Sequence, residues 1–600
     1  MNTLLKTGSR LGLGLGVALV LAACGAGLPT TSQPAGAAPA PSPAGAPAAV
    51  AGTPESGPLG PSAPAVPTDL PTSAAEASRF ITKSTFGTTQ ADIDRVMQLG
   101  YSGWIDEQFT KPSRTHLANI AEMTATLTET STQIGPTWMQ NSFWRNALTG
   151  EDVLRQRVSF ALSQIFVVSQ MNPDIGVRMA AGYYDILGRN AFGNFRQLLE
   201  EVTLSPAMGV YLSHLGNRKT DLATGRLPDE NYAREIMQLF TIGLYQLNQD
   251  GTVKVDPSDG QPIETYGVAD IQGLAKVFTG FSWGGPDTSS ARFVNRIVGN
   301  SDRDILPMQG YPQFHETGPK SFLGRTINTS TPNDSLKQAL DILFNHENVG
   351  PFIGRLLIQR MVTSNPSPAY VGRVAAAFAN NGKGVRGDMK AVIRAVLLDP
   401  EAANPPAEWA IVNGRIREPV LRMTALLRAL GATSTSKEFR IDTTDNPANS
   451  LGQSPMRAPS VFNFYRPGYV PPNSELSRTR LGAADRVPVA PELQITNEVS
   501  VAGWLIAAKG VIDNGIGSGT DVKPAFAPLT AMAHNPSALV DRLILLLAPA
   551  NQIPQSLRNE IVTEVLTITL PTTGDAAARL NRVKLATLLL VVSPEFMLQR

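Results

Sequence analysis

The sequence has little cysteine, little histidine and no excess of charge of either sign. One cysteine in 600 residues excludes an intramolecular disulfide and a multi-cysteine zinc site. Five histidines leave little material for a histidine-rich metal cluster. Because Lys+Arg number 51 and Asp+Glu number 50, the formal net charge is +1 and we expect no nucleic-acid partner.

Complete catalytic motifs are also missing. There is no P-loop and no Gly-x-Ser-x-Gly elbow, and Gly515-Ile-Gly-Ser-Gly519 lacks the third spaced glycine of a phosphate-binding loop. The pairs His315-Glu316 and His346-Glu347 begin like a zincin motif, but no second histidine follows four residues later. The sequence therefore leaves open whether the protein is an enzyme, and it indicates no particular cofactor or metal.

The first 23 residues have the layout of a signal peptide. Two basic residues precede an apolar run at 11–23 that is shorter than the ~20 residues a membrane-spanning helix needs. The small residues before Cys24, in Leu21-Ala-Ala-Cys24-Gly25, resemble the lipobox of lipoprotein precursors. That resemblance implies removal of residues 1–23 and lipidation of Cys24 with acyl chains such as palmitate, which would anchor the secreted chain in a membrane. An ordinary secretory signal with an incidental cysteine is the alternative.

Residues 24–75 form a linker dominated by Ala, Pro, Gly, Ser and Thr. Between residues 26 and 73 only two acidic residues, Glu55 and Asp69, interrupt this composition, which cannot build a core. A polyproline-like chain of this length reaches about 150 Å, so we expect it to act as a spacer between the membrane and the body. Binding to the cell wall or O-linked glycosylation are the alternatives.

Residues 76–600 are predicted to be a single large multi-helix domain of the mainly α class. Amphipathic segments with recognisable caps follow one another without strand-helix alternation. The exception is 246–266, where two Asp-Gly pairs predict a small β-hairpin or meander. Long connections at 281–333 and 432–496 are rich in Gly, Pro, Asn and Ser, and ordered loops of this length commonly carry function.

Two helices have the clearest signals. Thr89 with Asp92 predicts a capped helix start, and Gly100 predicts a stop. The segment 151–170 is apolar over more than half its circumference, which predicts a fully buried central helix. Further helices are expected at 103–109, 176–189, 193–203, 230–242, 267–279, 334–345, 348–362, 367–380, 387–398, 416–430, 497–513, 536–547, 554–568 and 574–591.

A polar helix face is the first candidate site. In the predicted helix at 230–242 the apolar residues form one stripe, while Asn231, Arg234, Glu235 and Gln238 share the other face and Glu230 lies at the helix start. These groups could line a cleft in which Glu235 acts as a general base or cation ligand. A solvated face with a Glu230/Arg234 pair is the structural explanation.

The second candidate lies in the long loop at 281–333. His315 and Lys320 place an imidazole and an ammonium close together in sequence without a helical reason. They could face the polar helix and complete a catalytic set with Glu235, although loop histidines are often merely exposed.

Several separated segments together resemble the bacterial domain-of-unknown-function 1800 family over roughly residues 76–598. They include the polar helix and the His315 loop, which look like signature motifs of that family. Its members have no assigned reaction, are often exported, and are often encoded beside a sulfatase-like family. The segments are Phe80–Gly87, Leu154–Val158, Asn190–Phe195, Glu230–Glu235, His315–Gly324, Leu357–Thr363 and Pro459–Tyr465.

These observations predict a lipid-anchored cell-envelope protein that binds or assembles at the cell surface, with an envelope protein or glycan as partner. The alternative is an envelope hydrolase or metal-assisted enzyme that uses the residues of the two candidate sites. Because Gly25, not Asp, follows the modified cysteine, we expect the outer membrane if the organism has one. Otherwise we expect the outer face of the plasma membrane.

Overall fold

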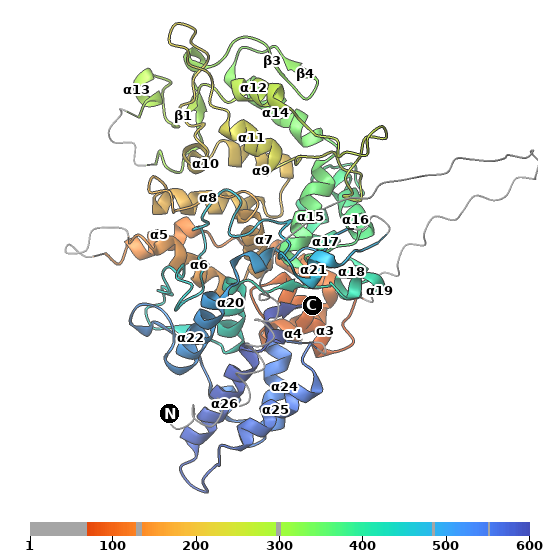
Figure 1. The fold of residues 1–600 in the computed structure, drawn as a ribbon. Coiled ribbons are helices and arrows are strands. Elements are labelled where there is room, and N and C mark those ends of the chain that lie inside the picture. The colour runs from red at the N-terminus through yellow and green to blue at the C-terminus, as the bar shows by residue number, and fades with distance from the viewer. Residues whose placement is uncertain (1–68, 128–134, 296–301, 483–485, 550–551) are drawn as a thin grey trace, which may run out of the picture. The chain divides into compact units, whose positions relative to one another are not determined.

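A computed structural model describes residues 69–127, 135–295, 302–482, 486–549 and 552–600. The predicted signal peptide, Cys24 and nearly all of the predicted linker lie outside these residues. All of the described residues belong to one compact unit, residues 68–600, which is built mainly of α-helices (Figure 1). The predicted fold class is therefore confirmed.

The elements follow one another in four groups along the chain. The first comprises α3 (Ala74–Ser84), α4 (Gln90–Thr110), α5 (His116–Thr124), α6 (Trp138–Thr149), α7 (Val153–Ser163), α8 (Val177–Asn190), α9 (Phe195–Thr203) and α10 (Pro206–Tyr211). The second comprises α11 (Asn231–Gln238), α12 (Val268–Val277), β1 (Phe281–Ser282), α13 (Ser290–Phe293), β2 (Gln309–Gly310), η1 (Pro312–Phe314), β3 (Lys320–Phe322), β4 (Arg325–Ile327) and α14 (Pro332–Asn345). The third comprises α15 (Val349–Met361), α16 (Pro368–Ala379), α17 (Met389–Leu397), α18 (Pro400–Ala403), α19 (Ala407–Ala410), β5 (Arg415–Ile416), α20 (Pro419–Ala429), β6 (Thr433–Ser434), α21 (Glu475–Arg478) and η2 (Pro491–Ile495). The fourth comprises α22 (Glu498–Asn514), η3 (Ser518–Thr520), β7 (Val522–Lys523), α23 (Ala527–Thr530), α24 (Pro536–Leu547), α25 (Gln555–Leu566), α26 (Ala576–Val591), α27 (Pro594–Met597) and β8 (Leu598–Gln599).

The strands are short and pair only in twos. Each pair is antiparallel: β1 with β2, β3 with β4, β5 with β8, and β6 with β7. The β5–β8 pair joins the last residues of the chain to the segment that leads into α20. The C-terminus is thereby fixed against the middle of the sequence.

The start of α4 follows from local chemistry. Thr89 accepts a hydrogen bond from the backbone N–H of Asp92, and the Asp92 side chain accepts one from Thr89, which makes the predicted capping box. Gly100 interrupts the helix with a φ of 74°. A Cβ atom there would lie 2.5 Å from the backbone oxygen of Asp69, so only glycine fits.

The predicted central helix is shorter than the sequence suggests. α7 ends at Ser163, and nearly all of its residues are buried as expected, but 165–168 continue as an irregular buried segment. The hydroxyl of Tyr183 donates to the backbone oxygen of Phe166 at 2.6 Å, which satisfies a carbonyl outside a helix. The prediction of a helix to residue 170 is therefore wrong, because an apolar run buried on every side has no periodicity that marks its end.

The region predicted to be a β-hairpin or meander forms three short antiparallel bridges. Three backbone hydrogen bonds close a ring at its centre. Gln246 donates to Ile263 at 2.8 Å, Ile263 to Lys254 at 3.0 Å, and Lys254 to Gln246 at 2.8 Å. The prediction of local β structure is confirmed: three extended segments, around Gln246, Lys254 and Ile263, meet, and each is hydrogen-bonded to the other two.

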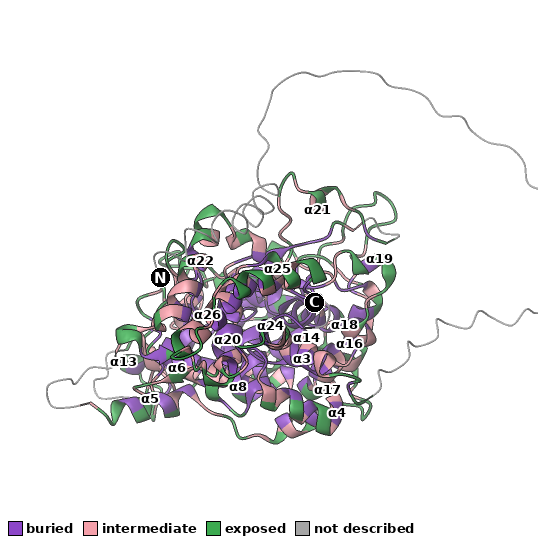
Figure 2. Ribbon diagram, turned by 90° about the horizontal axis from the view of Figure 1, so that it is seen from below, coloured by how far each residue is buried: buried purple, intermediate pink, exposed green. Residues whose placement is uncertain are grey.

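The helices bury a large set of apolar residues, and Figure 2 shows the buried stretches of the ribbon gathered in the middle of the molecule. One continuous apolar cluster extends from α3 to α27. Among the described residues, no helix is both long enough and apolar enough to cross a bilayer.

Candidate functional site

The start of α11 carries three of the predicted site residues on its exposed side. The backbone N–H of Asn231 donates to Asp229 at 2.9 Å, and its side chain donates to Ser213 at 3.4 Å. Arg234 and Glu230 form a loose ion pair at 3.9 Å, with both side chains at least one-third exposed. An exposed pair with this spacing contributes little to stability, so these groups are available to solvent.

Glu235 is the unusual member of this helix. Its residue is only 8% exposed, and its Oε2 atom is buried without a hydrogen-bond partner. Burial raises the pKa of Glu235, and the charge of Arg234 only partly opposes this. A carboxyl group with a raised pKa suits general acid–base chemistry, which makes Glu235 the strongest single catalytic candidate of the six predicted residues.

His315 is part of the core, contrary to the hypothesis of an accessible loop imidazole. It is fully buried, with Nδ1 2.7 Å from the backbone oxygen of Thr279 and Nε2 3.1 Å from Oγ of Ser335. Burial is the main reason why its pKa is lowered to about 4, so the ring is neutral at pH 7. The imidazole joins α14 to the end of α12, which is a structural role.

Lys320 has a similar role. It is fully buried on β3, where its ammonium group donates to the backbone oxygens of Gly318 at 3.2 Å and Thr329 at 2.9 Å. Burial lowers its pKa, and nearby Glu316 opposes this shift. The ammonium group therefore fastens the loop before β3 to the segment after β4.

The two candidate segments are connected by the loop that follows α10. The backbone of Lys219 donates to Phe314 at 2.9 Å, and the backbone of Thr220 donates to Glu316 at 3.3 Å. At the other end of this loop, Asn217 exchanges two hydrogen bonds with the backbone of Asp229. The His315 segment and the start of α11 are therefore both hydrogen-bonded to the loop that follows α10.

The charges around the two segments nevertheless form separate groups. Arg234 is the charged group that affects the pKa of Glu235, whereas Lys320, Glu316 and Lys219 affect that of His315. Among the described residues no hydrogen bond or ion pair joins Glu235 to His315 or Lys320. The expected set of six catalytic residues is therefore not assembled through direct contacts.

An open hollow of about 900 Å³ lies elsewhere, beside α8, α9 and α14. Of its lining residues, Asn194 lies in a segment of the family resemblance, and Ile305 and Pro307 lie in the long connection at 281–333; none is a predicted site residue. Half-buried apolar side chains from distant segments, including Ile186, Leu204 and Ile305, line it together with polar groups. A concave surface of this size with mixed lining is typical of a binding site.

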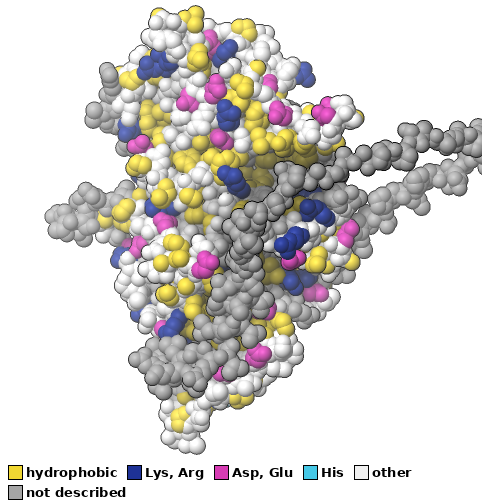
Figure 3. Space-filling model, in the orientation of Figure 1, with side chains coloured by type: hydrophobic (Ala, Val, Ile, Leu, Met, Phe, Trp, Pro, Cys, Tyr) yellow, Lys and Arg dark blue, Asp and Glu magenta, His cyan; other side chains and the backbone are white. Residues whose placement is uncertain are grey.

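Ion pairs surround the hollow. Arg196 contacts Glu200 at 2.6 Å and Asp341 at 2.7 Å, which joins α9 to α14 across 145 residues of sequence. Arg189 contacts Glu201 at 2.6 Å. Charges of both signs therefore lie among the apolar side chains that line the hollow. On the face that Figure 3 shows, charged groups of both signs are likewise scattered among apolar ones.

A buried ionic centre is the third notable arrangement, and segments of the family resemblance meet there. Arg415 donates to Glu418 at 3.0 Å and to Glu492 at 2.8 Å, and all three side chains are buried. Tyr465, from the last of those segments, donates to Glu418 at 2.9 Å. The guanidinium of Arg360, from another, lies 4.6 Å from the Tyr465 ring centre.

Glu418 is the best-satisfied charge in this centre. Besides Arg415 and Tyr465, the side-chain amides of Gln164 and Gln453 donate to it at 2.5 and 2.7 Å. Despite burial, these contacts lower the pKa of Glu418, so it stays ionised. Arg415 is held protonated in turn, because the two carboxylates raise its pKa.

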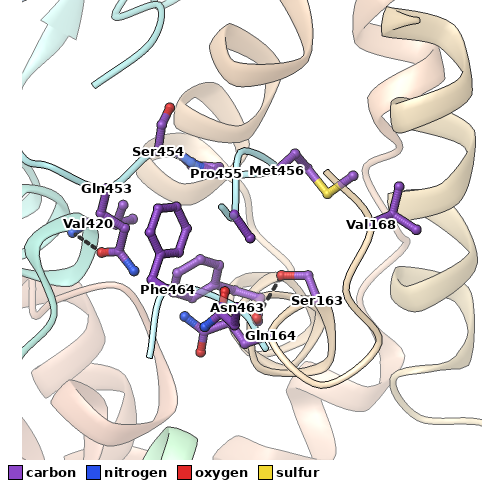
Figure 4. A pocket seen from close by; sticks show the side chains of 12 residues that line it. Ser163, Gln164, Val168, Val420, Gln453, Ser454, Pro455, Met456, Asn463 and Phe464 are labelled. Carbon is purple, nitrogen blue, oxygen red and sulfur yellow. Dashed lines mark hydrogen bonds between the residues drawn. The ribbon is translucent and has the colours of Figure 1, made fainter. Parts of the chain in front are cut away.

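A small pocket adjoins the ionic centre (Figure 4). It measures about 20 Å³ and is lined from α7, the start of α20 and the loop at 453–464. Oε1 of Gln164 and Nδ2 of Asn463 line it without protein partners. Such a volume suits one water molecule between an acceptor and a donor and is too small for an organic substrate.

Within the described part of the chain, no group of three or more His, Cys, Asp or Glu residues is placed to hold a metal ion. The lipidation candidate Cys24 lies outside that part.

The fold and its buried arginine–glutamate centre define a large, mainly α-helical protein without an assembled catalytic motif among the described residues. The family model described as a protein of unknown function, DUF1800, matches residues 79–598, and the chain belongs to this family. No curated protein and no solved structure matches the chain.

Proposed function

We propose that this protein is a lipid-anchored component of the cell envelope that works by binding, with the hollow beside α8, α9 and α14 as its recognition surface. The hollow is the observation that carries the binding role. Its lining combines apolar side chains with ion pairs of both signs, a mixture that is common in protein-binding surfaces. An envelope protein with apolar side chains between charged ones is the partner that fits best, and an envelope glycan is the alternative.

The anchor rests on the sequence around Cys24. Small residues precede this cysteine at the end of an apolar run, and acyl chains at about 0.8 kcal/mol per buried methylene give stable attachment when more than one is present. A Cys24→Ser protein should move from the membrane to the soluble fraction of lysed cells. Ser32→Ala, in the linker, is the matched control and should stay with the membrane. A Cys24→Ser protein that still sediments with membranes contradicts the anchor.

Photo-cross-linking in intact cells tests the binding role. Lys337 is an exposed residue of the hollow on α14, and Lys337→p-benzoylphenylalanine should give a discrete protein adduct. The same replacement at Arg480, an exposed residue of the 477–480 turn, is the control. Equal adducts from both positions, or none from Lys337, contradict a protein-binding hollow. Retention of the purified protein on isolated cell-wall glycan would favour the glycan partner.

An envelope hydrolase or metal-assisted enzyme is the second candidate, and Glu235 is the observation that favours it. Its unpartnered buried oxygen and raised pKa fit a general acid or base beside the exposed Arg234. His315 and Lys320 no longer support this function, because both are buried in structural contacts. Hydrolysis of an ester, phosphate or glycan by the purified protein that Glu235→Gln abolishes would establish it.

A further inference from the structure

A second group of arginines lies next to the ionic centre, where α20 begins. Arg417 follows β5 and is only 2% exposed. Its Nη1 donates to the backbone oxygen of Leu547, at the end of α24, at 2.9 Å. The Nε and Nη2 atoms are buried and have no partner. One edge of this guanidinium group is therefore unsatisfied.

No carboxylate compensates the charge of Arg417. Within the described residues no ion pair involves it, because nearby Glu418 and Glu492 are both engaged by Arg415. Its charged neighbours are Arg415 and Arg422, and together with burial they lower its pKa to about 9. A cation buried among cations is costly unless something of opposite charge accompanies it.

Arg422, in the first turn of α20, shares some of these features, although it is only half-buried and the charge of Glu418 partly opposes the lowering of its pKa. Its Nη1 contacts the Met597 sulfur at 3.1 Å, while its Nε atom is buried without a partner. The guanidinium lies 4.9 Å from the ring centre of Trp504, just as that of Arg417 lies 4.7 Å from Phe596. The guanidinium groups of Arg417 and Arg422 thus both lie over aromatic rings, and both have buried N–H groups without a hydrogen-bond acceptor among the described residues.

The aromatic rings do not satisfy the free N–H groups. Phe596 and Trp504 are stacked at 6.2 Å, and the central guanidinium carbons of Arg417 and Arg422 lie over these two rings. A ring face attracts the positive charge but offers no oxygen, nitrogen or sulfur atom as a hydrogen-bond acceptor. Among the described residues, Nε and Nη2 of Arg417 therefore still have no acceptor.

We propose that a small inorganic anion of halide or nitrate size binds at the Nε and Nη2 edge of Arg417, with Nε of Arg422 as a second donor. Two parallel N–H groups on one guanidinium edge form the fork that binds anions. A water molecule would accept the hydrogen bonds but leave the charge uncompensated. The near-complete burial of Arg417 restricts the ligand to small ions, so the site is a structural one that stabilises the junction of β5, α20 and α27.

Thermal unfolding of the purified full-length protein tests this site. Bromide or nitrate is titrated against gluconate, a bulky anion, at constant ionic strength. The wild type should gain Tm by several degrees in a saturable manner with either small anion. Arg417→Gln should lose the saturable gain, and Arg480→Gln, at an exposed turn, should keep it. Equal Tm in all anions, or an unchanged gain in Arg417→Gln, overturns the proposal.

Crystals soaked in bromide give a second readout that does not need the variant to fold. An anomalous peak within hydrogen-bond distance of Nε and Nη2 of Arg417 supports the anion site. Ordered density without anomalous signal at that edge identifies a water molecule and overturns it.

Discussion

The α11 face and the ionic centre around Glu418 use the same kinds of side chain in opposite ways. At α11, Glu230 and Arg234 meet loosely in solvent at 3.9 Å. In the centre, Arg415 and Glu418 are fully buried, and amide and hydroxyl groups complete the hydrogen bonds of the carboxylate. The polar groups at α11 are accessible to a partner, whereas those of the ionic centre are buried and hydrogen-bonded to one another. Accessible charged groups also lie around the hollow.

Removing Glu418 should have the largest effect on stability. Glu418→Ala leaves Arg415, Gln164 and Gln453 with buried unpaired donors, and we expect a loss of about 3–5 kcal/mol in the free energy of unfolding. Urea denaturation measures it. The control is Glu475→Ala, which breaks an exposed pair with Arg478 and should change stability by less than ~0.5 kcal/mol. Similar losses in both variants would remove the contrast between buried and exposed pairs.

Acid should destabilise the protein through its buried histidines. His214 stacks on Tyr232 at 3.9 Å, and burial lowers its pKa to about 4 from 6.5. Since the unfolded chain binds a proton first as pH falls from about 6.5 to 4, stability decreases with falling pH by up to ~1.4 kcal/mol per unit.

Between pH 6.5 and 4.5, the free energy of unfolding of the wild type should fall by about 2 kcal/mol more than that of His214→Gln. The exposed His534→Gln should leave it unchanged. Urea denaturation at several pH values makes the comparison. A slope that is the same in wild type and His214→Gln contradicts the assignment.

Lys320 should behave as a structural residue. Lys320→Met keeps the length of the side chain but removes the Lys320 donor from the carbonyl of Gly318 and one of two donors from that of Thr329, and we expect a loss of about 1–2 kcal/mol. Lys383→Met, at an exposed turn, should lose less than ~0.5 kcal/mol. A fully stable Lys320→Met protein would return Lys320 to the list of functional candidates.

The smallest effect is expected at Glu235. Because burial raises its pKa above 4.5, its ionisation opposes folding as pH rises through that raised pKa. Glu235→Gln should equal the wild type at pH 4 and exceed its stability by less than ~1 kcal/mol at pH 8. Thermal unfolding at the two pH values measures this. A variant that is less stable than the wild type at pH 8 would show that the carboxylate has a partner.

Local signals predict local structure well in this chain, and contacts between distant segments escape them. Thr89 and Asp92 mark a helix start, and the family segments identify the family, because both are written in neighbouring residues. His315 was a misleading signal, since its partner is a backbone oxygen 36 residues earlier. The hollow depends on Arg196 meeting Asp341 across 145 residues, which no spacing rule reveals.

The long connection at 432–496 shows the same limit. Its composition predicts an ordered loop, and it supplies Tyr465 and Glu492 to the ionic centre. Loops of this composition are usually surface features, but here a segment with little regular structure supplies polar partners to buried arginines, Glu492 from the short helix η2.

The most direct test of a binding function compares the two regions in one assay. Adduct formation from the photo-cross-linker at Lys337 is measured in intact cells for wild type, Glu235→Gln and Glu200→Arg, the last of which reverses a charge that contacts Arg196 in the rim of the hollow. A binding role predicts that Glu200→Arg abolishes the adduct and that Glu235→Gln retains it. Loss of the adduct in Glu235→Gln with full retention in Glu200→Arg would contradict this role and place the function at α11.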